Sequence, residues 1–294
     1  MSFRALVVGG TSGIGYAMAC RLAATANPPS SAVITISGRT KPENIPHENI
    51  EFARLDASSM RQIKQYTDAY KQSLSAAGTT NNKIDVLVVS QGILSMAGRT
   101  ETPGEGIDRK MALHYYGRQL IIRELLPVLS DEARVVIVLD GNLGHPSKLI
   151  WDDLDLKNNF SLQKAADHCL TMTDAMVQHW AATNEASGTR RHFVHAFPGV
   201  VNTSIFKSLP LGPFKAPLGL LGKALMTSPE DCAERLLTGT EARAAEGVKE
   251  GRYWSNIGRK GDLVAGKTVW TKEQRDRVVE HTWSIVDAAL AVKE

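Results

Sequence analysis

Short apolar runs alternate with longer stretches of helical spacing along most of the chain. The runs that suit buried strands are Phe3–Val8, Ala32–Ser37, Ile50–Leu55, Asp85–Ser90, Arg134–Leu139 and His192–Phe197, with a shorter one near Arg252–Trp254. Helical spacing marks Ile14–Ala24, Ser58–Ala77, Asp108–Leu129, Phe160–Asn184, a segment opened by Ser228-Pro229-Glu230, and Lys272–Val292. The strand runs are continuously apolar, which is typical of strands covered on both faces. Strands separated by helices predict parallel βαβ units in a doubly wound α/β sheet.

This alternation continues without a repeat or linker, so we expect one domain over residues 1–294. One segment, residues 204–227, breaks the pattern. Its centre, Phe206–Met226, is rich in Pro, Gly and Leu and follows the last core strand. An apolar segment there is suited to close as a lid over a nonpolar ligand, and an ordinary packed loop and helix is equally compatible with the sequence. The lid interpretation predicts an apolar small-molecule substrate.

The composition indicates the broad class and cellular location of the protein, but it says little about the reaction. The chain is 43% hydrophobic and 22% charged, with a formal net charge of +3, which does not favour nucleic acid as a partner. Its three cysteines, Cys20, Cys169 and Cys232, are far apart, so neither a disulfide framework nor a metal site is expected. No apolar run suits a secretory leader or a membrane span, and this predicts a cytoplasmic protein.

The clearest chemical motif is LVVGGTSGIG, Leu6–Gly15, between a predicted strand and a predicted helix. Gly9 permits a tight turn, Gly13 lets the backbone approach a pyrophosphate, and Gly15 permits close packing of helix on strand. The start of the helix presents free N–H groups and the positive end of a dipole to phosphate. This position, at the first strand-to-helix junction, predicts a dinucleotide site.

Four segments resemble the short-chain dehydrogenase/reductase superfamily, over roughly Phe3–Thr203. They are Val8 to Gly15 for a TGxxxGxG pattern in which Val8 departs from the usual Thr, Asp56 after the third strand, Ser90-Gln91-Gly92 after the fourth, and Pro198–Thr203 for a PGxVxT segment. The resemblance implies a three-layer α/β/α Rossmann fold of about seven strands, and commonly a homo-oligomer joined through the two long helices Asp108–Leu129 and Phe160–Asn184. For a divergent member it also implies an oxidoreductase of specialised (secondary) metabolism. The residues that it implies for cofactor binding are Gly9, Thr11, Ser12, Gly13, Ile14, Gly15, Arg39, Asp56, Gln91, Gly92, Pro198, Gly199, Val201 and Thr203.

The end of the second strand predicts which dinucleotide is bound. A site selective for NAD usually places an acid there to hold the ribose 2′-hydroxyl. This chain has Gly38 at that place, followed by Arg39, with Lys41 close by. Because the guanidinium fork matches phosphate geometry, the sequence favours NADP(H), unless Arg39 is a solvated surface charge.

The catalytic groups of the superfamily are Asn, Ser, Tyr and Lys, and none of them has a clear counterpart here. Gly117 sets a register in which His114 takes the Asn position, and the Ser position falls on Asp140 or Gly141. The stretch from Trp151 to Ala181 resembles the retinol-dehydrogenase-like branch without a gap, and it places Ala166 at the Tyr position and Leu170 at the Lys position. A register displaced by six residues offers Phe160 and Lys164 instead and still lacks the tyrosine hydroxyl.

Alanine and leucine cannot transfer a proton, so ordinary tyrosine-dependent carbonyl reduction is not expected. Three interpretations remain: redox chemistry with a substitute acid, a non-redox reaction such as isomerisation, dehydration or cyclisation, and a non-catalytic nucleotide-binding protein. The catalytic candidates are Asp140 and His114. Asp140 suits a turn cap equally well, and His114 suits a neutral core histidine. His168 is expected to point away from the site, because two residues on a helix turn through about 200°.

Overall fold

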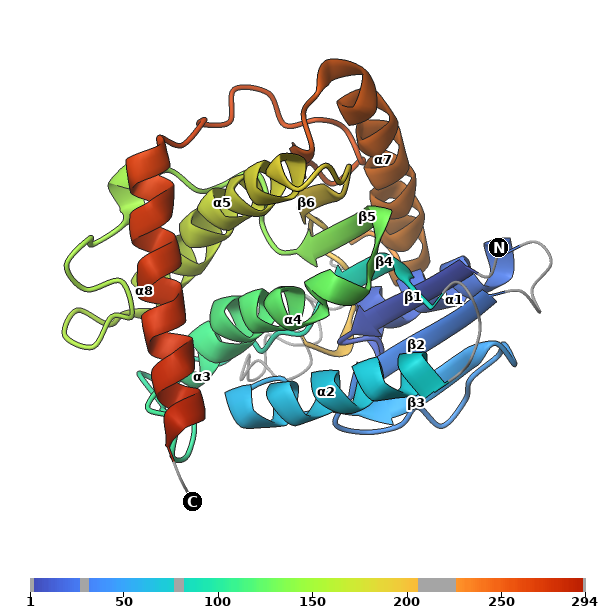
Figure 1. Cartoon of the computed structure of the whole chain (residues 1–294). Helices are drawn as coiled ribbons and strands as arrows, with labels where there is room; N and C mark the ends of the chain where they lie inside the picture. Colours follow the sequence, from blue (N-terminus) through green and yellow to red (C-terminus); the bar gives the residue numbers. More distant parts are fainter. Residues whose placement is uncertain (1–2, 27–31, 77–81, 206–225, 293–294) are drawn as a thin grey trace.

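The protein is built on one sheet of seven parallel strands (Figure 1). The computed structural model describes residues 3–26, 32–76, 82–205 and 226–292. The strands are β1 (Phe3–Val8), β2 (Ala32–Gly38), β3 (Ile50–Arg54), β4 (Ile84–Val89), β5 (Leu129–Val138), β6 (His192–Ala196) and β7 (Trp254–Ile257). Their order is β3-β2-β1-β4-β5-β6-β7, so the winding reverses between β1 and β4. Ligands bind at such a switch point in open α/β sheets, and the predicted doubly wound Rossmann fold is confirmed.

Helices cover both faces of the sheet. One face packs on α1 (Gly13–Thr25) and α7 (Pro229–Glu250), and the other packs on α2 (Met60–Ala76), α4 (Gly117–Leu125) and α5 (Leu162–Ala186). The apolar side chains of the central strands are buried in two clusters, one on each face, whereas β3 and the start of β5 carry exposed residues. This double cover is the physical reason for the continuous apolar runs in the sequence.

The predicted helix Asp108–Leu129 is not one regular helix. A short turn, α3 (Arg109–Met111), is capped by the Asp108 side chain and runs into a π-helical segment, Ala112–Tyr116, before α4 begins. After α4, a turn at Leu126–Val128 leads directly into β5, which begins at Leu129, five residues before the predicted start of that strand. A π turn inserts an extra residue into the helix, and such segments often occur at functional sites.

The last helix, α8 (Lys272–Ala291), crosses the outer side of the α2, α4 and α5 layer (Figure 1). Tyr115 shares a 2.6 Å hydrogen bond with Thr282 of α8, and the guanidinium of Arg123 on α4 lies 4.3 Å from the ring centre of Trp283. The outer side of the two helices predicted to join subunits is therefore packed against the chain's own helix. A homo-oligomer remains a prediction, and this arrangement does not favour assembly through those two helices.

Of the predicted lid, residues 204–227, the stretch 206–225 lies outside the described residues. Within the part of the chain that the structure describes, no helix is both long and apolar enough to cross a membrane.

Candidate active site

The glycine-rich loop between β1 and α1 lies against the chain that follows β4. A Cβ atom on Gly9 would stand 2.5 Å from the backbone nitrogen of Gln91, and one on Gly15 would stand 2.3 Å from the Ser90 hydroxyl oxygen. Both positions therefore require glycine. Gly13 has a φ of +57° and faces Thr203 across a gap that a Cβ atom would reduce to 3.1 Å. The loop, the end of β4 and the segment after β6 thus form one continuous wall.

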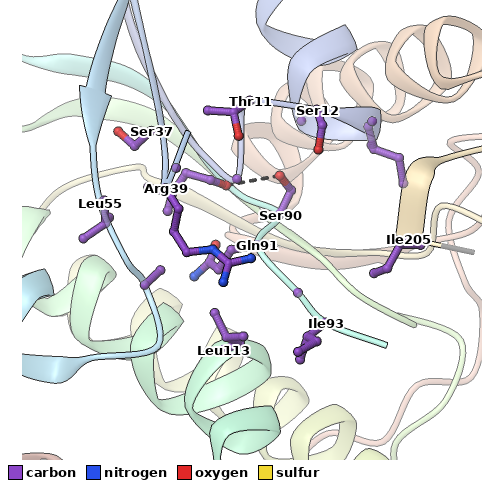
Figure 2. Close-up of a pocket in the computed structure, with 18 of the residues that line it drawn as sticks. Thr11, Ser12, Ser37, Arg39, Leu55, Ser90, Gln91, Ile93, Leu113 and Ile205 are labelled. Carbon is purple, nitrogen blue, oxygen red and sulfur yellow. Dashed lines mark hydrogen bonds between the residues drawn. The ribbon is translucent and has the colours of Figure 1, made fainter. Parts of the chain in front are cut away.

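This wall encloses a cavity of about 310 Å³ at the switch point of the sheet (Figure 2). Of the residues predicted to bind cofactor, the cavity is lined by Gly9, Thr11, Ser12, Gly13, Ile14, Gly15, Arg39, Asp56, Gln91, Gly92 and Thr203. Pro198, Gly199 and Val201 do not line it. The structure thus brings most of the predicted residues together around one space.

Two arginines line the cavity and lie near Asp56. Figure 2 shows the Arg39 side chain reaching from the end of β2 toward Gln91. Arg109, from α3, also lines the cavity, and its buried Nε has no hydrogen-bond partner among the described residues. Burial works to raise the pKa of Asp56, but hydrogen bonds from Ser58 and the charges of Arg39 and Arg109 outweigh it and lower that pKa. Sequence reasoning missed Arg109, because its distance from Arg39 along the chain conceals their proximity.

The residues around the cavity fit a nicotinamide dinucleotide. Gln91 is only 7% exposed, yet neither its amide nitrogen nor its amide oxygen has a partner among the described residues. Buried amides normally bond to something, so a ligand with both donors and acceptors suits this place. Ser12 precedes α1 in extended conformation and its side chain makes no capping bond, so the first N–H groups of α1 are free for phosphate.

A second cavity of about 280 Å³ adjoins the first, since Ile93 lines both. Its walls are mostly aliphatic: Ile93, Leu94, Ser95, Met96, Lys110, His114, Leu139, Leu162, Ala165, Ala166, Cys169 and Leu170. Leu94 and Met96 are exposed at its rim. An apolar cavity with few polar groups is the usual form of a small-molecule site.

The α5 wall of this second cavity carries no acid or base. Ala166 and Leu170, predicted at the Tyr and Lys positions, both line it. In the displaced register, Lys164 is exposed and neither Phe160 nor Lys164 lines either cavity. Burial raises the pKa of the Cys169 thiol to about 12, so Cys169 is a neutral thiol near neutral pH.

His114 lies in the π-helical segment and faces the second cavity. Its Nε2 is 2.9 Å from the Ile93 carbonyl oxygen, and its buried Nδ1 has no partner within the described chain. Burial, reinforced by the charge of Arg118, lowers the pKa of His114 to about 4. The imidazole is therefore neutral near pH 7 and can offer Nδ1 to a ligand.

Two further cations share the side of the helix that carries His114, and sequence reasoning missed both. Lys110 lines the second cavity one turn before His114. Arg118, one turn after it, is 1% exposed and donates hydrogen bonds to the carbonyl oxygens of Leu113, Gln91 and Val138. The spacing i, i+4, i+8 was the available signal, because residues four apart on a helix are neighbours.

Asp140 and His168 lie elsewhere. Asp140 lines neither cavity, and its Oδ1 accepts a 3.0 Å hydrogen bond from the Asn142 backbone, as a turn cap does. The structure therefore does not bring Asp140 together with His114 in a cavity. His168 is fully buried, with Nε2 accepting from the Ile150 nitrogen and Nδ1 facing the Leu154 carbonyl oxygen. That bonding places His168 in the core, pointing away from both cavities.

The sheet order, the glycine loop and the cavity at the switch point define a dinucleotide-binding α/β protein. A family profile described as short chain dehydrogenase matches residues 4–142. A crystal structure of NADPH-bound carbonyl reductase from chicken fatty liver is similar, with a TM-score of 0.59 and 16% identity, and the match covers 91% of this chain and 98% of that one. The profile match, together with the oxidoreductase relatives described next, supports membership of the chain in the short-chain dehydrogenase/reductase superfamily.

Curated relatives carry names of oxidoreductases. An oxidoreductase of Emericella nidulans is 37% identical over 223 residues, which are 73% of this chain and 62% of that protein. Human polyprenol dehydrogenase is 27% identical over 265 residues, which are 86% of this chain and 76% of its own length. The chain spans 60–62% of the length of the Emericella and Aspergillus relatives that it matches.

Proposed function

We propose that the protein is an NADP(H)-binding oxidoreductase that acts on an apolar small molecule. The observation that carries this proposal is the pair of adjoining cavities, one polar with two arginines and one aliphatic, which meet at Ile93. A nicotinamide dinucleotide bound in the polar cavity would donate or accept hydride. The names of the relatives support an oxidoreductase in general.

The preference for NADP(H) rests on charge at the end of β2. Gly38 occupies the place where an acid would hold the 2′-hydroxyl, and Arg39 and Arg109 both line the cavity and both act on the charge of Asp56. Arginine forms charge-assisted bonds to phosphate that are roughly twice as strong as neutral hydrogen bonds. A ribose 2′-phosphate therefore gains contacts here that a 2′-hydroxyl does not.

The apolar substrate class rests on the aliphatic walls of the second cavity and the exposed Leu94 and Met96 at its rim. The name of the human relative, polyprenol dehydrogenase, points to a substrate of the same character. Within this cavity we assign to His114 the binding of a substrate polar group through Nδ1. Burial, reinforced by the charge of Arg118 behind it, lowers the pKa of His114 and keeps the imidazole neutral.

A second candidate function is supported by a different observation. Ala166 and Leu170 leave the α5 wall without a strong proton donor, and no tyrosine is among the described residues that line the second cavity. A reaction that needs bound cofactor but consumes none, such as an isomerisation, dehydration or cyclisation, fits such a wall. Cofactor consumption during turnover separates this candidate from the oxidoreductase.

Titration of NADPH and NADH tests the cofactor assignment. We expect Arg39→Ala to weaken NADPH binding by about tenfold to a hundredfold, as loss of a charge-assisted bond does, and to leave NADH binding nearly unchanged. Arg54→Ala is the matched control, because Arg54 ends the neighbouring strand β3, is exposed and does not line the cavity. An unchanged NADPH/NADH ratio in Arg39→Ala would show that Arg39 is not the selector.

A further inference from the structure

Among the described residues that line the substrate cavity, Lys110 is a cation to which the proposed function assigns no role. Lys110 lines the cavity and its side chain is only 11% exposed. The ammonium lies 2.8 Å from the Gly98 carbonyl oxygen and 3.1 Å from Asp108 Oδ2. It also stands 5.0 Å from the centre of the Phe160 ring. Contacts with Gly98, Asp108 and Phe160 thus fix the position of the Lys110 side chain.

Lys110 has hydrogen-bonding capacity to spare. An ammonium carries three N–H donors, and the Gly98 and Asp108 oxygens are the acceptors recorded for Lys110 among the described residues. A buried donor normally finds a partner. Because Lys110 borders the cavity, a ligand atom there is well placed to accept the third bond.

The carboxylate of Asp108, which pairs with Lys110, has no free hydrogen-bonding capacity of this kind. Asp108 Oδ1 accepts from the backbone nitrogens of Lys110 and Met111, and Oδ2 accepts from the Thr100 nitrogen and the ammonium. Asp108 therefore balances the charge of Lys110 and fixes its position. The polar end of the cavity is consequently built to donate a hydrogen bond without carrying a large net charge.

The α5 wall of the cavity does not offer a strong hydrogen-bond donor. On α5 the cavity meets Leu162, Ala165, Ala166, Cys169 and Leu170, and the only polar group among them is a thiol, which is a weak donor. Among the described lining residues, the charged and basic groups, Lys110 and His114, are on one helical segment, and the remaining hydroxyl is that of Ser95 in the loop after β4. A ligand oxygen that enters the cavity finds its strong donor on that helix.

We infer that Lys110 is the substrate-binding donor of this site, and that the ligand is an apolar molecule with an uncharged carbonyl oxygen that accepts a hydrogen bond from its ammonium. A fixed positive donor aimed at a carbonyl oxygen also stabilises negative charge that develops there during a reaction. The inference rests on the substrate cavity of the proposed function and adds the polar group by which the substrate is recognised.

A matched pair of probes tests the inference by calorimetry, with no turnover required. The ligands 2-acetylnaphthalene and 2-ethylnaphthalene share an aromatic body, and only the first has a carbonyl oxygen. Wild type is expected to bind the ketone more tightly than the hydrocarbon. Lys110→Met is expected to reduce that preference about tenfold or more, the effect of losing one charged donor, while affinity for the hydrocarbon stays within about twofold.

Two further variants and a cofactor titration distinguish the possible outcomes of this experiment. Lys148→Met removes an exposed lysine that lines neither cavity and should preserve the preference for the ketone. If Lys110→Met does not fold, Lys110→Gln, which keeps a neutral donor, should give a preference weaker than that of wild type. An unchanged preference in both Lys110 variants, or no binding of either probe to wild type, would overturn the inference. NADPH titration of the same variants reports separately on the cofactor site, which Lys110 does not line.

Discussion

At the scale of single residues, Arg118 is a buried cation whose hydrogen-bond partners within the described chain are carbonyl oxygens and not a carboxylate. Arg118 directs its guanidinium at three backbone carbonyl oxygens, two of which follow or end the strands β4 and β5. Burial lowers the pKa of Arg118 to about 10, which leaves it charged near neutral pH. This charge holds the two strand ends together and opposes protonation of His114 one turn away.

Titration of His114 should therefore make the free energy of unfolding depend on pH. Its pKa is about 4 in the folded protein, below the usual value near 6.5. The unfolded chain then binds more protons between these values, so stability is full above about pH 6.5 and falls as pH drops toward 4. Between pH 7 and pH 5 this one group contributes a loss of about 2 kcal/mol.

Urea unfolding of wild type and His114→Gln at the two pH values measures this contribution. The loss on acidification should be smaller by that amount in His114→Gln. His192 has a pKa lowered to about 4 by burial and lines neither cavity, so His192→Gln should reduce the loss similarly without affecting binding of apolar ligands. An identical pH dependence in wild type and His114→Gln would contradict the low pKa of His114.

At the scale of elements, α8 acts as an outer cover for the helices beside the site. Its inner face buries Val278, Thr282, Val286 and Ala289, and the Tyr116 hydroxyl lies 2.9 Å from His281 Nε2. Since Tyr115 and Tyr116 belong to the π-helical segment that carries His114, α8 stabilises the irregular turn on which the candidate site is built.

A charged side chain on the inner face of α8 should disrupt the packing of α8 against the helices beside the site. Val286 is fully buried, so Val286→Asp places an unpaired carboxylate in an apolar cluster and should cost about 3 kcal/mol or more of stability. Exposure of the apolar surface beneath should also promote self-association. Thermal melting and light scattering measure both effects, with Ser284→Asp on the exposed side as control. Equal melting temperatures for the two variants would show that α8 is not tightly packed.

At the scale of the whole molecule, a buried polar network connects α5 with the last two strands and the chain beyond them. Asp174 lies 2.6 Å from His195 Nδ1 on β6, 2.7 Å from Asn256 Nδ2 on β7, and 2.5 Å from Lys267 Nζ. Lys267 also donates to the Leu143 carbonyl oxygen. The network therefore anchors the loop after β5, which borders the candidate site, to the C-terminal part of the sheet.

Removal of one charge from this network should be costly. Asp174→Asn leaves the Lys267 ammonium buried without its carboxylate, and breaking such a pair typically costs about 3–5 kcal/mol. The Lys272–Asp276 pair on α8 is exposed, so Asp276→Asn should cause no measurable change. Denaturant unfolding of both variants compares them directly. A stable Asp174→Asn protein would mean that the network contributes little to the fold.

The sequence by itself determined the sheet and the dinucleotide loop, because both depend on local rules. Continuous apolar runs follow from double cover of each strand. Gly9 and Gly15 mark places where a side chain would collide with a neighbouring segment, and Gly13 has a positive φ that favours glycine. The sequence also predicted Ala166 and Leu170 at the Tyr and Lys positions, and both line the second cavity, because the regular helix α5 preserves the spacing of its residues.

Only the tertiary structure decided which polar groups share the site. Arg109 and Lys110 reach different cavities although they are adjacent in sequence, and the π-helical segment that follows them is not visible in local spacing. Asp140 was expected near the ligand from its place after a central strand, and its bond to the Asn142 nitrogen turns it into a cap. These outcomes depend on contacts between segments far apart in the chain, where packing and hydrogen-bond satisfaction compete, and no local pattern records the result of that competition.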